Sequence, residues 1–219
     1  DLELAQAVCG SGGWELVKTP IDWDSKDMEL NSGSIDCIWN GFTMNGREED
    51  YTWSKPYVDN SQVIVVPESS DVTDLSGLAG KIVGVQAASA ALELLSEGGD
   101  QADLAATFGS LQQFPDYNNA FVELQAGSID AVAMDIGVAQ YQLKQKEGYK
   151  ILDEKLNSEK YAIGFKLGNE ELRDTVDDAM EQLVADGTFA KLAEKYELTD
   201  MVCSTDEGTE GTETEGAAD

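Results

Sequence analysis

Short apolar segments of strand length alternate along this chain with amphipathic segments of helix length, and this alternation constrains the fold more than any other feature. Clear strand signals lie at 62–66 and 81–85, and helix signals lie at 118–125 and 170–184. Such alternation predicts an α/β fold with mostly parallel sheets. We also expect strands at 14–21, 35–39, 111–114, 129–134, 149–152 and 161–167.

One sequence pattern occurs twice. Residues 29–40 read Glu-Leu-Asn-Ser-Gly-Ser-Ile-Asp-Cys-Ile-Trp-Asn, and residues 123–135 read Glu-Leu-Gln-Ala-Gly-Ser-Ile-Asp-Ala-Val-Ala-Met-Asp. In each copy a helix signal ends at a glycine, and a buried strand follows that ends in polar residues. Because ligands bind beyond the carboxyl ends of parallel strands, two such units favour two lobes around one site. The alternative is that helix–glycine–strand units look alike through packing alone.

The charge and the missing residue types exclude several functions. The chain has 14 basic and 43 acidic residues, a net charge of −29, which argues against a nucleic-acid partner. It has no histidine, so histidine-based catalysis and metal binding are excluded. The cysteines, Cys9, Cys37 and Cys203, show no zinc-site spacing, and their pairing stays open. We expect no metal and no cofactor.

The sequence contains no membrane-spanning signal, and its C-terminal end lacks the signals of a folded segment. No apolar stretch reaches the roughly 20 residues needed to cross a bilayer. Residues 204–219 consist almost entirely of threonine, glutamate, glycine, aspartate and alanine, too few apolar groups to offset the entropy of ordering. We therefore predict a disordered acidic tail at 204–219.

The segment after the first copy of the repeated pattern offers a receptor for a carboxylate. Gly41 lets a ligand approach the backbone, Thr43 offers a hydroxyl, and Arg47 offers a planar fork of donors. The alternative for Arg47 is a surface ion pair with Glu48 or Asp50, worth about 0–1 kcal/mol.

The second half of the chain offers complementary groups. Ser89 and Ala90 begin a predicted helix, whose first N–H groups suit a carboxylate; an ordinary helix cap at Ser89 is the alternative. Asp135 ends a strand and could bind an ammonium group or cap the next helix. Trp23 is one of several aromatic residues that could cover a ligand side chain. Together these groups match the α-carboxylate and α-ammonium of an amino acid.

The sequence resembles the extracellular solute-binding proteins of polar amino acid ABC transporters over nearly all of residues 1–198. The motifs that carry the resemblance are Ile21-Asp-Trp23-Asp, Gly41-Phe-Thr43 followed by Arg47, Tyr51-Thr-Trp-Ser-Lys-Pro-Tyr57, Lys81-Ile-Val-Gly-Val-Gln86, Ala185-Asp-Gly-Thr188 and Lys195-Tyr196. The spacing from Thr43 to Arg47 is one residue shorter than the family's.

The resemblance implies a two-lobed, type II periplasmic-binding fold with hinge strands near 62–66 and 161–165. One lobe would comprise 1–66 and 161–203 and lack the family's first strand, and the other would comprise 67–160. Gly41, Thr43, Arg47, Ser89 and the Ala90 N–H would hold the ligand carboxylate. Asp135 would bind the amine, Trp23 would stack on the side chain, and Gln86 would line the cleft.

The implied function is capture of an extracellular amino acid, without catalysis, and its delivery to an ABC transporter permease. The resemblance implies a monomer outside the cytoplasm, lipid-anchored through a segment that precedes Asp1. Two alternatives stay open from the sequence: a sensor domain of a signalling receptor, and a dehydratase-like enzyme on the same fold.

Overall fold

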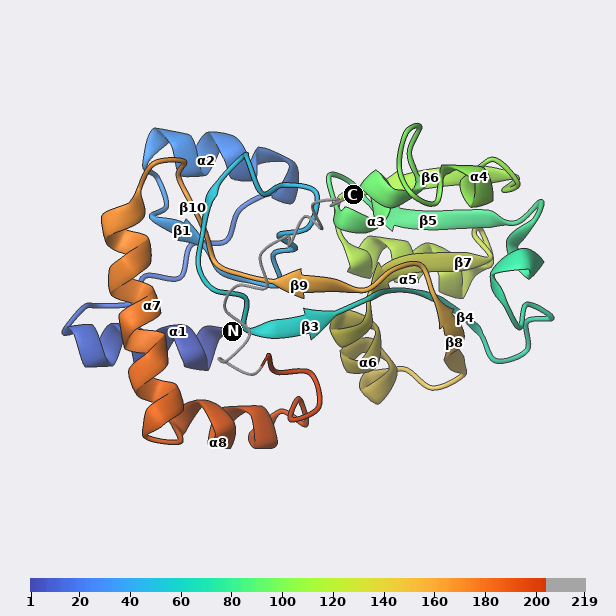
Figure 1. The fold of residues 1–219 in the computed structure, drawn as a ribbon. Coiled ribbons are helices and arrows are strands. Elements are labelled where there is room, and N and C mark those ends of the chain that lie inside the picture. The colour runs from blue at the N-terminus through green and yellow to red at the C-terminus, as the bar shows by residue number, and fades with distance from the viewer. Residues whose placement is uncertain (204–219) are drawn as a thin grey trace, which may run out of the picture.

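The computed structural model describes residues 1–203, whose helices and strands form two lobes joined by a pair of crossing strands (Figure 1). The predicted acidic tail at 204–219 lies outside the described residues. No helix within 1–203 combines the length and the apolar character that a membrane crossing requires.

The first lobe contains a three-stranded sheet in the order β1-β10-β2, with both pairings antiparallel. Apolar side chains of its sheet and helices form two buried clusters, which include Phe42, Trp53 and Phe165. The elements of this lobe are α1 (Leu2–Gly12), η1 (Trp23–Ser25), α2 (Lys26–Ser32), β1 (Cys37–Ile38), β2 (Thr52–Trp53), β10 (Gly164–Phe165), α7 (Glu170–Ala185) and α8 (Thr188–Lys195).

The second lobe is built on a five-stranded sheet in the order β6-β5-β7-β4-β8. Successive side chains of β4 enter different cores, because Ile64 and Val66 belong to one buried cluster and Val63 and Val65 to another. Its elements are β4 (Gln62–Pro67), η2 (Leu75–Leu78), β5 (Ile82–Gln86), α3 (Ala90–Leu95), α4 (Ala102–Ala105), β6 (Ser110–Phe114), α5 (Tyr117–Ala126), β7 (Ala131–Asp135), α6 (Ile136–Gln145) and β8 (Tyr149–Lys155).

The strands that connect the lobes are β3 (Val58–Asn60) and β9 (Glu159–Tyr161), which pair antiparallel (Figure 1). The hinge prediction at 62–66 therefore needs correction, because these residues form β4 inside the second lobe's sheet. Apolar side chains that are buried on both strand faces need cover on both sides, which a two-stranded ribbon lacks. The second hinge strand precedes β10, which belongs to the first lobe.

The prediction of mostly parallel sheets holds only for β6-β5-β7. Strand β4 lies between β7 and β8 and runs antiparallel to both. Its direction follows from the hinge: β4 carries the chain away from β3, whereas β7 runs back toward the hinge and ends there at Asp135, opposite Gln62. A strand inserted in the opposite sense makes both of its pairings antiparallel.

The strand expected at 14–21 does not form, and Val17 is 74% exposed. A strand needs a neighbouring backbone to bond to, and within 1–203 β1 pairs with β10 alone. The repeated pattern, in contrast, folds alike in both copies. Helices α2 and α5 end at Gly33 and Gly127, whose φ angles of 81° and 75° suit glycine, and β1 and β7 follow.

Candidate functional site

Asp135 ends β7 at the hinge and accepts four hydrogen bonds there. Its Oδ1 accepts from the Tyr161 hydroxyl at 2.6 Å, from Gln62 Nε2 at 2.7 Å and from Asn60 Nδ2 at 2.9 Å. Its Oδ2 accepts from the Tyr117 hydroxyl at 2.9 Å. Burial raises the pKa of Asp135, and the negative charge of Glu159 raises it further, while the bonds from the two tyrosines and Gln62 oppose that shift.

Glu159, on hinge strand β9, is a second buried carboxylate beside Asp135. Its Oε1 accepts from Asn60 Nδ2 at 2.6 Å, from Gln62 Nε2 at 2.7 Å and from the Thr43 hydroxyl at 2.7 Å. The same two amide groups thus donate to both carboxylates. Among residues 1–203, none of the ion pairs includes Asp135 or Glu159.

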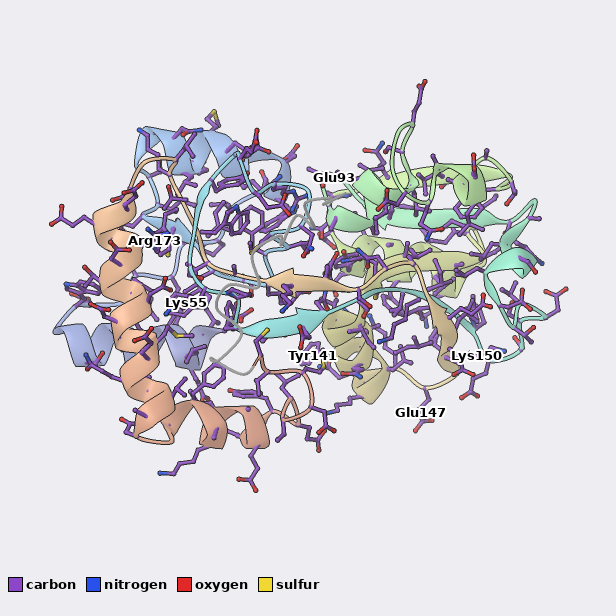
Figure 2. The ribbon with its side chains drawn as sticks, in the orientation of Figure 1. Lys55, Glu93, Tyr141, Glu147, Lys150 and Arg173 are labelled. Carbon is purple, nitrogen blue, oxygen red and sulfur yellow. The ribbon has the colours of Figure 1, made fainter. Side chains whose placement is uncertain are left out.

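Arg47 joins this network to the opposite lobe. Its guanidinium is buried, with Nη1 donating to the Thr43 carbonyl at 3.4 Å. Its Nε and Nη2 donate to Glu93 Oε1 at 3.2 and 2.5 Å. Glu93 belongs to α3 and lies on the side of the second lobe that faces the first (Figure 2). The Arg47–Glu93 ion pair therefore spans the two lobes.

A second contact between the lobes converges on the carbonyl of Ala88. This oxygen accepts from Trp23 Nε1 at 3.1 Å and from Lys26 Nζ at 3.5 Å, both in the first lobe. Ala88 has φ +54°, a left-handed conformation that disfavours residues with a Cβ. Ser89 follows and caps α3, accepting from Leu92 N at 3.2 Å.

The structure brings some of the predicted site residues together and leaves others apart. Thr43, Arg47 and Asp135 lie in one hydrogen-bonded network, linked through Glu159. Trp23, Ser89 and Ala90 lie where the lobes touch. Gly41 packs beside the Tyr161 ring, and its N–H donates to the Asp1 carboxylate at 2.9 Å. Gln86 is apart from this network, because its amide donates to the Pro115 carbonyl within the second lobe.

Sequence reasoning missed Asn60, Gln62, Glu93, Tyr117 and Glu159. Two of them carried a local signal, because Asn60 and Gln62 stand directly before the apolar run 63–66, where continued burial is expected. Glu93 and Glu159 carried no such signal in a chain with 43 acidic residues. Their partners are 46 and 116 residues away, at Arg47 and Thr43.

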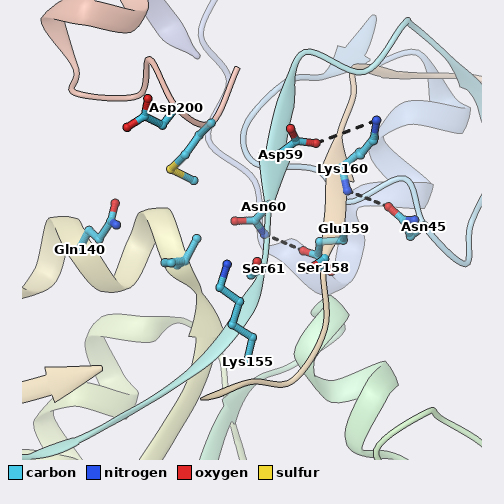
Figure 3. A pocket seen from close by; sticks show the side chains of 12 residues that line it. Asn45, Asp59, Asn60, Ser61, Gln140, Lys155, Ser158, Glu159, Lys160 and Asp200 are labelled. Atoms are coloured by element: carbon cyan, nitrogen blue, oxygen red, sulfur yellow. Dashed lines mark hydrogen bonds and ion pairs between the residues drawn. The ribbon is translucent and has the colours of Figure 1, made fainter. Parts of the chain in front are cut away.

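A cavity of about 430 Å³ opens beside the hinge strands (Figure 3). Asn60 and Glu159 line it and belong to the network as well, whereas Arg47 and Trp23 are not among its lining residues. The lining residues are Asn45, Asp59, Asn60, Ser61, Ile136, Gln140, Lys155, Ser158, Glu159, Lys160, Asp200 and Met201.

Two lobes, a paired-strand hinge and a buried polar network between them define a type II periplasmic-binding architecture. The chain belongs to the bacterial extracellular solute-binding proteins, family 3, whose family model matches residues 1–199. Proteins of this family bind solutes rather than catalyse reactions, and the expected α/β fold and family are confirmed.

Individual relatives share about a quarter to a third of their residues with the chain. It is 26% identical to the L-cystine-binding protein TcyJ of Escherichia coli K12 (90% of this chain, 73% of TcyJ). It is 28% identical to the arginine-binding extracellular protein ArtP of Bacillus subtilis (90% and 76%). A substrate-binding protein of a Streptococcus pneumoniae ABC uptake transporter, solved with bound histidine, is 30% identical (90% and 81%) with a TM-score of 0.84.

Proposed function

We propose that this chain binds an amino acid outside the cytoplasm, between its two lobes, and delivers it to the permease of an ABC transporter. The similar proteins are named for binding cystine or arginine or were solved with histidine, and each of these ligands carries α-carboxylate and α-ammonium groups. The observation that carries the proposal is the continuous network from the Arg47 guanidinium, through Thr43 and Glu159, to the Asp135 carboxylate.

The carboxylate end of the ligand is assigned to Arg47, the Thr43 hydroxyl, the Ser89 hydroxyl and the Ala90 N–H. The Thr43 hydroxyl would have to leave Glu159 Oε1 to donate to the ligand. Arg47 keeps donors for this role: of its five N–H groups, two contact Glu93 and one contacts the Thr43 carbonyl. The two that remain, on Nη1 and Nη2, can hold a carboxylate.

The ammonium end is assigned to Asp135, which has no cationic partner within residues 1–203. Trp23 covers the ligand side chain, and Gly41 admits the ligand to the backbone. Gln86 would have to leave the Pro115 carbonyl to line the cleft.

Binding is proposed to act through closure of the hinge. The assigned groups lie on different lobes, so a ligand that contacts all of them favours the arrangement in which the lobes touch. Strands β3 and β9 are short and connect the lobes, which suits them to flex. We further propose that the protein acts as a monomer and is held at the membrane by a lipid anchor.

Isothermal titration calorimetry with single amino acids at neutral pH tests the proposal. Arg47→Ala should weaken binding by about 2–5 kcal/mol, because its loss leaves a buried carboxylate without a partner. Arg173→Ala is the matched control, since Arg173 lies on α7 away from the network (Figure 2). Absence of heat with every amino acid, or wild-type affinity in Arg47→Ala, would contradict the assignment.

A further inference from the structure

Five charged side chains belong to the hydrogen-bonded network at the hinge and to the contacts between the lobes, and their charges do not balance. The other charged residues that line the cavity beside the hinge are two positive and two negative, so their charges cancel; they are Lys155, Lys160, Asp59 and Asp200. Arg47 and Lys26 are positive and belong to the first lobe. Glu93 and Asp135 of the second lobe and Glu159 of the hinge are negative. Two positive and three negative groups leave one negative charge in excess.

The excess negative charge does not come from the Arg47–Glu93 ion pair. The Glu93 carboxylate offsets the charge of Arg47 at 2.5 Å, before any ligand carboxylate is considered. Burial lowers the pKa of Lys26 most, and the positive charge of Arg47 lowers it further, while the negative charges of Asp27, Glu93 and Asp24 raise it. The first lobe therefore supplies little unbalanced positive charge to the cleft.

The excess lies at the hinge, where Asp135 and Glu159 share their donors. Both amides turn their NH₂ groups toward the carboxylates, which leaves Asn60 Oδ1 and Gln62 Oε1 buried without hydrogen-bond partners. Figure 3 shows the Asn60 oxygen pointing away from Glu159. A buried acceptor without a hydrogen-bond partner costs free energy. The attraction of the two carboxylates for the amide NH₂ groups therefore outweighs the cost of the two unpaired oxygens.

An α-amino acid with a neutral side chain leaves this balance unchanged, because its carboxylate and ammonium cancel. We infer that the site selects an amino acid with a positively charged side chain, whose extra charge offsets the second buried carboxylate at the hinge. Buried charge without compensation is unfavourable, and this gives a cationic ligand its advantage over a neutral one of the same size. The inference rests on the proposed function and specifies the ligand class of that site.

Arginine and citrulline form a matched ligand pair, because they have similar size and shape and differ in the charge of the terminal group. Calorimetric titration of the wild-type chain should give arginine an affinity at least roughly tenfold higher than citrulline. Equal affinities for the two would overturn the inference while leaving amino acid binding intact. No binding of either compound, or of any other amino acid, would instead overturn the proposed function.

Charge-neutral variants test whether the named carboxylates cause the preference. Glu159→Gln and Glu93→Gln should each lower the arginine-to-citrulline affinity ratio several-fold. Glu97→Gln is the control, because Glu97 is exposed, lies four residues beyond Glu93 and changes the net charge by the same amount. An unchanged ratio in folded Glu159→Gln and Glu93→Gln, or an equal drop in Glu97→Gln, would overturn the assignment. The wild-type comparison stands even if Glu159→Gln fails to fold.

Discussion

The guanidinium of Arg47 and the carboxylate of Glu93 belong to different lobes, yet Arg47 Nη2 lies 2.5 Å from Glu93 Oε1. The hydrogen bonds from Trp23 and Lys26 to the Ala88 carbonyl also join the first lobe to the second. All three contacts exist only while the lobes touch. If the hinge closes on a ligand as proposed, changes to these residues should act on closure rather than on the core of either lobe.

Trp23→Phe should weaken amino acid binding without unfolding the protein. The change removes the Nε1 bond to the Ala88 carbonyl but keeps a ring that can pack edge-on against Phe42. Loss of one neutral hydrogen bond corresponds to about 1 kcal/mol, or roughly fivefold in affinity. Calorimetry on Trp23→Phe and on the exposed-site control Trp14→Phe checks this. An affinity loss of equal size in both variants would contradict it.

Asp135→Asn should stabilise the ligand-free protein while abolishing ammonium binding. An asparagine Oδ1 can accept the three bonds to Asp135 Oδ1, and its Nδ2 can donate to the Tyr117 oxygen after the hydroxyl rotates. Removing a buried charge next to Glu159 should raise the free energy of unfolding by about 1 kcal/mol, or the melting temperature by about 2–4 °C. Thermal unfolding with and without amino acid measures both effects, with exposed Asp153→Asn as control.

The stability difference between wild type and Asp135→Asn should depend on pH. The pKa of Asp135 is raised in the folded state. The folded protein therefore binds the proton more tightly than the unfolded chain, in which an aspartate has a pKa of about 3.9. Across the interval between the two pKa values, the Asp135 contribution to stability falls as pH rises. The advantage of Asp135→Asn should therefore shrink in acid, as unfolding titrations from neutral pH downward can show. A constant difference would contradict the raised pKa.

Ala88→Gly should stabilise the protein by about 1 kcal/mol. Ala88 has φ +54°, where a Cβ is strained and glycine is not. Ala87→Gly provides a control of opposite sign, because Ala87 does not share the positive φ and glycine there only adds freedom to the unfolded chain. Chemical denaturation of both variants decides the point, and destabilisation by both would contradict the left-handed conformation of Ala88.

Replacing Gly164 or Gly137 with alanine should change the free energy of unfolding in opposite directions. A Cβ at Gly164 would lie 2.6 Å from Phe42 Cε1, a fully buried ring, so Gly164→Ala should cost about 1–3 kcal/mol through overpacking. Gly137 lies within α6 with open space around its Cβ position, so Gly137→Ala should stabilise by about 0.5–1 kcal/mol. The sign of each change in unfolding free energy is the measurement.

The predicted elements that the structure contains are those specified by the residue pattern within the segment itself. The run 63–66 became a buried strand, and the repeated pattern became two helix–glycine–strand units capped at Gly33 and Gly127. The segment 14–21 has strand-like residues as well, but strand formation depends on a partner backbone that local sequence does not supply.

The sequence by itself determined the alternating elements, the family motifs and the polar strand end at Asp135, because periodicity and strand-end polarity are local properties of the chain. Only the tertiary structure decided which groups meet at the hinge. Thr43 reaches Glu159 across 116 residues and Gln62 reaches Asp135 across 73. Such contacts depend on how the chain crosses the hinge and on the direction of β4, and no local pattern encodes either.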